Sequence, residues 1–551
     1  MTNKDIAKKF QLLGKVMELH GENPFKIRSY TNAYRTLRKW QEPLADMSDE
    51  EISQIKGVGK AISTKIRELV DTGEMKTLQK YLDKTPAGVI EMLQISGFGP
   101  KKVKTVWEDL GVESVGELLY AVNENRLIEL KGFGKKTQDD LRQKLEYYMR
   151  SRNQFHYASI EPETTEVWQH LQKHLPDARV SLTGACRRKA TTLTQIDLLI
   201  DQDTIPEAAF GNTLQLLEKN TDSWQAQTET GFPVHIHRAP PASFGTQLFQ
   251  TTGHPDFLQA FRESFPGVNL DEQADEEAIF AQANLPVIAP VLRESDYGIT
   301  VVQNGQADYL VTEDHIKGVV HSHSTYSDGL NTLREMAEYS RDQGYEYLVI
   351  TDHSKSAFYA NGLQPERVWQ QMEEIDAINK DLAPFRIFKG IESDILSSGA
   401  LDYEEEVLQA FEVIVASIHS NLRMDKDKAT QRLITAIENP YTTILGHPTG
   451  RLLLSRKGYP IDHRKVIDAC AENSVCIELN ANPYRLDLDW SWIPYALEKG
   501  VPISINPDAH STAGIHDIHY GVIAAQKGGL TVDKCLNTKD LSSFSDWLTS
   551  R

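Results

Sequence analysis

Histidine and carboxylate residues recur at equivalent places in the last part of the chain, after Glu313. Seven apolar runs lie there, and six of them end in, or lead directly into, a residue of these types. Imidazole and carboxylate groups are the usual protein ligands of zinc, manganese and iron. One such residue is more often an ordinary surface or core residue, but a set at one end of one fold is typical of a metal site. The candidate ligands are His321, His323, Asp328, His353, Glu392, His419, His447, Asp508 and His510.

The seven apolar runs are strand-like and alternate with helical segments. They cover residues 317–321, 347–352, 385–392, 412–418, 442–446, 475–479 and 501–506. This alternation predicts a parallel sheet, most economically a closed β/α barrel. Active sites of such barrels lie at the carboxyl ends of the strands. The candidate ligands fall at those ends, so the elements would bring them together.

The ligands lie in the motifs HSHSTYSDG, ITDHS, GIESDI, ASIHS, GHPTGR and NPDAH. These resemble, in order, the motifs of the polymerase-and-histidinol-phosphatase (PHP) family of metal-dependent phosphoesterases. The resemblance implies a distorted (β/α)7 barrel with three divalent metals, manganese or zinc, with iron as a further choice. Glu392, Asp508 and His510 would be central to catalysis. Arg451, in GHPTGR, is a candidate phosphate clamp, with a structural role as the equal alternative.

The resemblance also divides the ligands among the three metals, with Glu392 as a bridge between the first two. The first metal would take His321, His323, Glu392 and Asp508; the second Glu392, His419 and His447; the third Asp328, His353 and His510.

A second recurring pattern lies in residues 1–154, where apolar residues have helical spacing. Residues 55–66, 95–106 and 130–141 each read apolar-x-Gly-apolar-Gly-x, followed by a helix. The glycines permit a tight turn, and the exposed amides of a helix start favour phosphate. The pattern resembles the helix-hairpin-helix, which implies sequence-independent contact with the DNA backbone. The residues assigned to DNA are Gly57, Gly59, Lys60, Gly97, Gly99, Lys101, Lys102, Gly132, Gly134 and Lys135.

The middle of the chain has a mixed α/β pattern, with strand-like runs at residues 178–185, 196–200 and 233–237. Residues 241–312 are less regular and are interpreted as the remains of a small domain plus a linker. Within them, residues 274–294 predict a helix, a Pro-marked turn and an extended connection.

The order of these parts resembles the bacterial family X DNA polymerases over nearly the whole chain. Motifs that carry the resemblance are TNAYRTL, LTGACRRK, QIDLLI, PVHIHRAPPASFG and LPVIAPVLRE. The resemblance implies a palm domain in which three aspartates hold two magnesium ions. Only Asp197 is kept, because Gln195 and His235 occupy the other two positions. Magnesium prefers hard oxygen ligands, so we expect a degenerate palm that does not add nucleotides.

Two further features of the palm bear on nucleotide binding. Ala185 follows Gly184 where the resemblance implies a Gly-Ser pair, although Arg187 and Arg188 remain. Asp201 lies four residues beyond Asp197, about 13 Å along an extended strand, which is too far to replace a missing ligand.

These patterns predict a multidomain fold of five parts. Residues 1–84 would form a helical DNA-binding domain, 85–154 a fingers-like domain with two helix-hairpin-helix motifs, and 155–245 a degenerate nucleotidyltransferase-like palm. Residues 246–312 would form a reduced thumb-like region and linker, and 313–551 the PHP domain.

Charge is unevenly distributed between these parts. Residues 1–154 contain 27 Lys and Arg against 22 Asp and Glu, whereas the whole chain has a formal net charge of −19. A cationic module on an acidic body is consistent with an anionic partner. The four cysteines form no CxxC pair and there is no long apolar run or signal peptide. We therefore expect a cytoplasmic protein with no membrane association, whose partner is gapped or nicked DNA; no obligate protein partner is evident.

The sequence thus predicts a DNA-repair phosphoesterase acting on 3′ ends, as an exonuclease, a 3′-phosphatase or both. Three alternatives stay open: a working gap-filling polymerase with this barrel as its exonuclease, a small-molecule phosphatase similar to histidinol phosphatase, and a non-enzymatic DNA-bound scaffold. The lost aspartates weigh against the first, the DNA-binding repeats against the second and the complete ligand set against the third.

Overall fold

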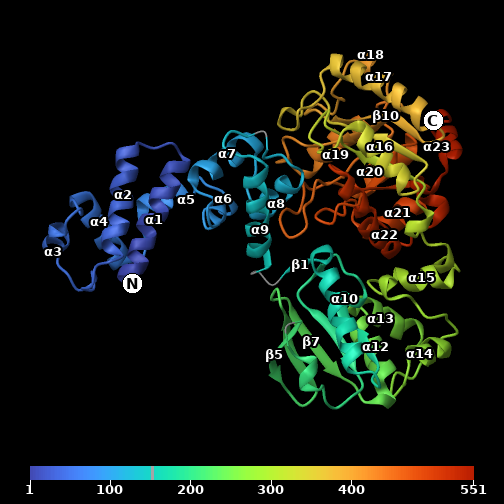
Figure 1. Ribbon diagram of the computed structural model, residues 1–551, viewed down its shortest axis with the longest axis horizontal. Helices are drawn as coiled ribbons and strands as arrows, with labels where there is room; N and C mark the ends of the chain where they lie inside the picture. Colours follow the sequence, from blue (N-terminus) through green and yellow to red (C-terminus); the bar gives the residue numbers. More distant parts are fainter. Residues whose placement is uncertain (129, 151–153, 212) are drawn as a thin grey trace. The chain divides into compact units, whose positions relative to one another are not determined.

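The computed structural model describes residues 1–128, 130–150, 154–211 and 213–551 (Figure 1). The chain divides into two compact units, residues 1–148 and residues 149–551. No helix among the described residues is long and apolar enough to cross a membrane.

The first unit is entirely helical in its described residues. Its helices are α1 (Asn3–Leu19), α2 (Pro24–Leu37), α3 (Asp49–Gln54), α4 (Lys60–Thr72), α5 (Lys76–Leu82), α6 (Ala87–Met92), α7 (Pro100–Leu110), α8 (Val115–Asn123) and α9 (Lys135–Arg150). Apolar residues at helical spacing, such as Ile6, Phe10 and Leu13 of α1, form the buried core of the first part. Short Gly-containing turns join α3 to α4 and α6 to α7, as the sequence predicts.

The second unit begins with a five-stranded sheet of order β2-β4-β7-β6-β5. Its elements are β1 (Phe155–His156), α10 (Tyr157–His174), β2 (Val180–Leu182), α11 (Gly184–Arg187), β3 (Thr192–Leu193), β4 (Ile196–Ile200), β5 (Leu214–Lys219), β6 (Ser223–Thr228) and β7 (Pro233–Arg238). Strands β4 and β7 pair in parallel, with Asp197 opposite His235. The sheet is the α/β palm that the sequence predicts.

Two strands of the five-stranded sheet were not predicted, nor were the two-residue strands β1 and β3. β5 lies at the edge of the sheet, and only Leu214 among its six residues is buried. β6 is polar on its outer face, where Ser223 and Gln225 alternate with the buried Trp224 and Ala226. A strand of this kind carries little apolar signal, because most of its side chains face water.

Residues after the palm are more regular than the sequence indicates. Four helices lie there: α12 (Phe244–Thr252), α13 (Pro255–Ser264), α14 (Glu276–Gln282) and α15 (Tyr297–Gln303). Phe249, Phe257, Phe261 and Phe280 pack together as the centre of a separate apolar core. This region therefore contains a small helical assembly with its own core, more than the remains of a small domain plus a linker that the sequence indicated. The predicted helix in residues 274–294 is α14, and the predicted Pro-marked turn includes the short 3₁₀ turn Pro290–Leu292.

The rest of the chain forms the predicted barrel. Its strands are β8 (Gly318–Ser322), β9 (Tyr347–Ile350), β10 (Arg386–Asp394), β11 (Val413–Ser417), β12 (Ile444–Leu445), β13 (Cys476–Asn480) and β14 (Ile503–Asn506). They pair in parallel in chain order. A bridge between Ser322 and Ala509 joins the first strand to the end of the last. The sheet is thus nearly closed, and each predicted strand is present with ends displaced by at most two residues.

Helices cover the outside of the barrel, among them α16 (Leu333–Asp342), α17 (Pro365–Leu382), α19 (Lys426–Ile437) and α20 (His463–Glu472) (Figure 1). The inside changes from apolar to polar along the strands. At the amino ends, Val320, Phe388, Val413 and Cys476 pack against Phe544 of the C-terminal helix α23 (Leu541–Thr549). Toward the carboxyl ends the buried positions become carboxylates, amides and imidazoles. One end of the barrel is an apolar plug, and the other is a polar site.

Candidate metal centre

The carboxyl ends of the barrel strands bring all nine predicted ligands into one buried cluster. His321 lies in β8 and Glu392 in β10, while the others follow their strands within a few residues. His321 and Asp508 have left-handed backbone conformations, with φ of 64° and 53°. Such a conformation costs a residue other than glycine on the order of 1–3 kcal/mol and is concentrated at functional sites. The contacts of the surrounding fold must therefore offset the conformational cost at these two residues.

Glu392 is at the centre of the cluster. Its Oε1 lies 3.0 Å from His447 Nε2, 3.1 Å from His419 Nε2 and 3.4 Å from His321 Nε2. Its Oε2 lies 2.9 Å from His353 Nδ1 and 3.8 Å from His323 Nε2. The two oxygens therefore face different sets of imidazoles. Oε1 thus faces His321 of the expected first set as well as His419 and His447 of the expected second set, whereas Oε2 faces His323 and His353.

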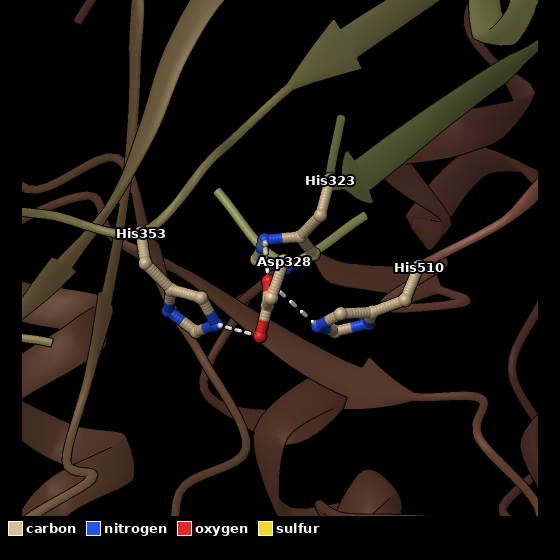
Figure 2. A group of neighbouring side chains, drawn as sticks. All are labelled: His323, Asp328, His353 and His510. Carbon is tan, nitrogen blue, oxygen red and sulfur yellow. Dashed lines mark ion pairs between the residues drawn. The ribbon is translucent and has the colours of Figure 1, made fainter. Parts of the chain in front are cut away.

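Asp328 is the centre of a second set, which Figure 2 shows with His323, His353 and His510. Its Oδ2 lies 3.5 Å from His353 Nε2, and its Oδ1 lies 3.3 Å from His510 Nε2 and 3.9 Å from His323 Nδ1. One ligand atom from each of the four residues lies within 4.8 Å of the others. The set could hold one metal ion.

The groups in the structure differ in detail from those that the family resemblance implies. His321, His323 and Asp508 form one group, as expected. His353 belongs both to the Asp328 group and to a group with Glu392 and His419. Its two ring nitrogens face the two carboxylates, so it lies between the second and third sets instead of in the third only. His447 contacts the cluster through Glu392.

The electrostatics of the cluster favour ionised carboxylates. Burial alone would raise the pKa of Glu392, but His419, His321 and His353 hold that pKa well below its usual range. The pKa of Asp328 is lowered in the same way by His510 and His353. Burial and the neighbouring imidazoles lower the pKa of His323 to about 3, whereas Asp328 and Glu392 outweigh burial and raise that of His353 to about 10. The site thus combines anionic oxygens with imidazole nitrogens.

Several buried polar atoms of the cluster have no hydrogen-bond partner among the described residues. They include His323 Nδ1, both ring nitrogens of His353, Asp328 Oδ2 and Glu392 Oε2. An unsatisfied buried polar group costs about 1–3 kcal/mol, more for a charged one. Metal ions would satisfy these atoms, and the mixed nitrogen and oxygen donor set suits manganese, zinc or iron better than magnesium. The residues present therefore fit a multinuclear metal site.

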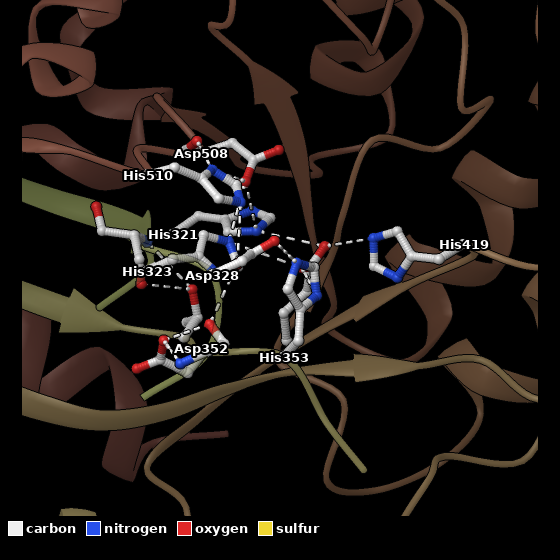
Figure 3. A network of polar contacts seen from close by, with 12 residues as sticks. His321, His323, Asp328, Asp352, His353, His419, Asp508 and His510 are labelled. Carbon is white, nitrogen blue, oxygen red and sulfur yellow. Dashed lines mark hydrogen bonds and ion pairs between the residues drawn. The ribbon is translucent and has the colours of Figure 1, made fainter. Parts of the chain in front are cut away.

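Three carboxylates that sequence reasoning missed support the cluster, and Figure 3 labels one of them, Asp352. Glu478 Oε2 lies 2.6 Å from His321 Nδ1, and Asp394 Oδ1 lies 2.5 Å from His419 Nδ1. Asp352 accepts hydrogen bonds from Ser324, Ser327 and the amide of Gln371. Glu478 and Asp394 are partners of the kind that fix the tautomer and orientation of a ligating imidazole, whereas Asp352 bonds the loop that follows β8. Their signal in the sequence is a carboxylate within or directly after an otherwise apolar strand.

Arg451 does not lie free beside the cluster. Its guanidinium forms an ion pair with Asp489 and donates to the carbonyl oxygens of Arg485 and Leu486. Burial by itself would raise the pKa of Asp489, but Arg451 lowers it. These contacts favour the structural role for Arg451 over the phosphate clamp that the sequence left open.

The palm brings Gln195, Asp197 and His235 together as predicted. Gln195 Nε2 donates to Asp197 Oδ1 at 2.6 Å, and Asp201 is held by Arg179 at 2.7 Å. No other carboxylate is grouped with Asp197 among the described residues; its partners in a potential metal group are both histidines.

The two palm arginines are already engaged. Arg187 pairs with Glu276 at 2.7 Å, and Arg188 pairs with Glu294 at 2.9 Å. Both also contact Thr252, through its hydroxyl and its carbonyl oxygen respectively. These bonds fasten the palm to the helices that follow it. They argue against the nucleotide-binding role that the motif implied.

The three Gly-containing turns have the conformation that their sequences predict. Gly57, Gly97 and Gly132 have φ of 89°, 77° and 90°, which disfavours any side chain. Gly59 and Gly99 are the N-caps of α4 and α7 with no side-chain cap, and α9 begins directly after Gly134. A Cβ atom added to the second glycine of each turn would meet nothing within 4 Å. Each turn therefore presents open backbone amides at a helix start.

Basic side chains accompany these turns. Lys60, Lys101 and Lys135 are exposed, and Lys102 is half-buried. Amides, helix dipole and cations together form a surface suited to phosphate.

Comparison with known families identifies helix-hairpin-helix domains in the first unit. Residues 1–75 match a helix-hairpin-helix domain, and residues 89–146 match a SAM-like helix-hairpin-helix tandem.

Comparison with whole proteins finds relatives of the full chain and of its C-terminal part. The chain is 34% identical to the DNA polymerase/3′-5′ exonuclease PolX of Bacillus subtilis over 574 aligned positions, which cover 100% of this chain and 99% of that protein. A probable phosphatase of Thermoanaerobacter sp. is 28% identical over 42% of this chain and 94% of its own length. A probable phosphatase of Acetivibrio thermocellus is 31% identical over 35% of this chain and 80% of its own length. The full-length similarity shows that the chain belongs to the PolX family, the bacterial family X DNA polymerases with a C-terminal PHP domain.

Proposed function

We propose that this protein is a DNA-binding, metal-dependent phosphoesterase that acts on DNA 3′ ends, as a 3′-5′ exonuclease, a 3′-phosphatase or both. The observation that carries the proposal is the buried cluster around Glu392, whose two oxygens face separate sets of imidazoles. The named activity of the Bacillus subtilis relative supports the exonuclease interpretation, and the shorter relatives support the phosphatase interpretation.

The cluster would hold up to three divalent metals, manganese or zinc first and iron next. His321, His323 and Asp508 would form one end of the site, His419 and His447 another, and Asp328 with His510 the third, with Glu392 and His353 shared between them. When bound, such metals polarise the phosphoryl oxygen and activate the attacking water.

The protein's own residues prepare this site. Seven of the nine ligands are buried, and Asp328 and His419 are partly buried, which strengthens their mutual electrostatics. Glu478 holds His321 with Nε2 facing Glu392 and Asp508, and Asp394 holds His419 with Nε2 facing Glu392. His321 and His419 therefore each present Nε2, and not Nδ1, to the centre of the cluster.

The first unit would bring DNA to this activity. Three turns with open amides and adjacent lysines support backbone contact without base reading, which suits gapped or nicked duplexes. We propose that the enzyme acts in the cytoplasm, without membrane association.

The palm is proposed to be inactive as a polymerase. Gln195 and His235 lack the charge that assembles a magnesium pair, and Arg187 and Arg188 are held by Glu276 and Glu294. A working gap-filling polymerase remains the second candidate, because the name of the full-length relative includes that activity.

One experiment separates these functions. A 5′-labelled primer strand in a gapped duplex, with a 3′-hydroxyl or a 3′-phosphate, is incubated with the full chain and manganese, with and without nucleotides. We expect shortened strands or loss of the terminal phosphate, neither of which depends on nucleotides. A ladder of longer strands would favour the polymerase. An unchanged strand, with hydrolysis of small phosphomonoesters instead, would favour a small-molecule phosphatase and overturn the proposal.

A further inference from the structure

We propose that the palm carries a separate mononuclear site for a divalent transition metal, formed by Asp197, His235 and His237. This site lies outside the barrel cluster and outside the function proposed above. Among the described residues, these three form a group of metal-ligating side chains in the palm whose ligand atoms lie within 4.8 Å of one another.

The sheet explains why the three side chains meet. β4 and β7 are parallel neighbours with Asp197 opposite His235, and His235 and His237 are two residues apart, so all three side chains emerge on one face. The alternate residues Val234 and Ile236 are buried in the core on the other face. His237 Nε2 lies 3.5 Å from Asp197 Oδ1, and the two imidazole rings have centroids 4.0 Å apart.

The distances are close to those of a metal-bound set. Ligands of a tetrahedral zinc ion at 2.0–2.1 Å are about 3.4 Å from one another. The ligand atoms, which lie within 4.8 Å of one another, therefore need to approach by at most about 1.4 Å, which small side-chain rotations can supply.

The carboxylate is oriented before any metal binds. Gln195 Nε2 donates to Asp197 Oδ1, and Asp197 Oδ2 lies against Gly184, where an added Cβ would come within 2.9 Å. A carboxylate oxygen has two lone pairs, so Oδ1 can accept from Gln195 and still bind a cation. The replacement of one carboxylate by glutamine thus supplies a residue that positions Asp197.

The donor set determines the class of metal. Two imidazoles and one carboxylate suit zinc, manganese or iron, whereas magnesium prefers oxygen ligands. All three side chains are partly exposed; the side chain of His237 is 32% exposed and that of Asp197 15%. Three protein ligands with a solvent-facing side leave a coordination position for water or a phosphate oxygen.

The test combines a local measurement with a metal count on the full chain after removal of metals by chelator and dialysis. Diethylpyrocarbonate modifies accessible imidazoles, and mass spectrometry reads its attachment to residues 233–238. We expect micromolar zinc to suppress this modification in the natural chain at least tenfold, and Asp197→Asn to abolish the protection. Gln195→Ala should weaken zinc binding by about 10- to 100-fold, since it removes a group that orients a ligand.

His170 and His174 provide a matched control. Their rings are also close, at 4.4 Å between centroids, but they are not grouped with a carboxylate among the described residues. At buffered free zinc, His235→Asn/His237→Asn should bind one equivalent fewer than the natural chain, and His170→Asn/His174→Asn should bind the same number. Circular dichroism checks that each variant is folded. Equal zinc content in all three chains, or unprotected residues 233–238 in the natural chain, would overturn the proposal.

Discussion

The barrel and the palm both place histidines and carboxylates on adjacent parallel strands, yet they hold them very differently. In the barrel, nine side chains are almost fully buried, and opposite charges shift the pKa of Glu392 and Asp328 far down despite burial. In the palm, Asp197 and two histidines are partly exposed on one face of an open sheet. Burial is therefore the main difference between the tightly coupled barrel cluster and the small, solvent-facing group of the palm.

The two regions also differ in the hydrogen-bond partners that orient their candidate ligands. Barrel imidazoles are held by carboxylates, as His321 is by Glu478 and His419 by Asp394. In the palm the carboxylate itself is held by an amide, Gln195, and the nearby arginines are engaged elsewhere. A retained motif thus does not imply a retained role, because the partners of each residue decide what it can bind. The substitutions below should affect the barrel and the palm differently, and they are given from the largest expected effect to the smallest.

Loss of the central barrel carboxylate should have the largest effect. Glu392→Gln keeps the shape of the side chain but removes the negative charge that faces both sets of imidazoles. We expect 3′-end hydrolysis to fall on the order of a thousandfold, because several kcal/mol of charge stabilisation are lost. Coupled sites fail as a unit, so His321→Ala and Asp508→Ala should be about as damaging.

A chelator should abolish the activity of the natural chain, and manganese should restore it more fully than magnesium. Glu412→Gln is the control: this carboxylate pairs with Arg386 near the amino ends of the strands, away from the cluster. If Glu392→Gln keeps most of the natural rate, Glu392 is not a bridge between catalytic metals.

Removal of the supporting carboxylates should have an intermediate effect. Glu478→Gln and Asp394→Asn leave every ligand in place but loosen the orientation of His321 and His419. We expect manganese affinity or activity to fall by about 10- to 100-fold. Manganese titrations of activity and direct binding measure this, with the exposed Glu406→Gln as control. An effect as small as that of Glu406→Gln would show that the imidazoles are positioned by packing alone.

The lysines beside the turns should have a smaller, salt-dependent effect. Changing Lys60, Lys101 and Lys135 to Ala should reduce the slope of log affinity against log salt by about 0.9 for each lysine that contacts phosphate. Fluorescence anisotropy with a gapped duplex at several salt concentrations measures the slope. Lys4, Lys8 and Lys80, which are also exposed but lie outside the three turn sequences, provide a control of equal charge. Equal slopes for the two triple variants would remove the turns from the DNA-binding surface.

Changes in the palm should leave hydrolysis unaffected. Gln195→Ala should retain the natural rate of 3′-end hydrolysis, because Gln195 contacts Asp197 and no barrel ligand among the described residues. Neither this variant nor the natural chain should extend a primer with magnesium or manganese. A clear extension ladder from the natural chain would refute the proposed loss of polymerase activity.

Much of the barrel could be predicted because its signals are local. Each strand is a short apolar run, and each is bounded by turns and by a helix with its own periodicity. The ligands follow their strands in sequence, as His353 follows β9 and His447 follows β12, so a rule about strand ends locates them. The glycine turns were equally visible, since φ near 90° at Gly57 and Gly132 requires glycine.

The polar or exposed strands β5 and β6 of the palm lack an apolar run of this kind. β5 has one buried residue, and the edge of the palm sheet was missed. The helices after the palm were underestimated because their aromatic core joins Phe249 to Phe257, Phe261 and Phe280 across irregular connections.

The sequence by itself determined the order of the parts, the seven barrel strands, the nine candidate ligands and the three glycine turns, because each depends on neighbours within a few residues. Only the tertiary structure decided how these residues are partnered. It placed His353 between two carboxylates and paired Arg187 and Arg188 with Glu276 and Glu294. It also brought Asp197 of β4 beside His235 and His237 of β7, although β5 and β6 lie between these strands in the sequence. Such contacts depend on which strands pair and in what register. The spacing of residues along a single strand does not determine either of these.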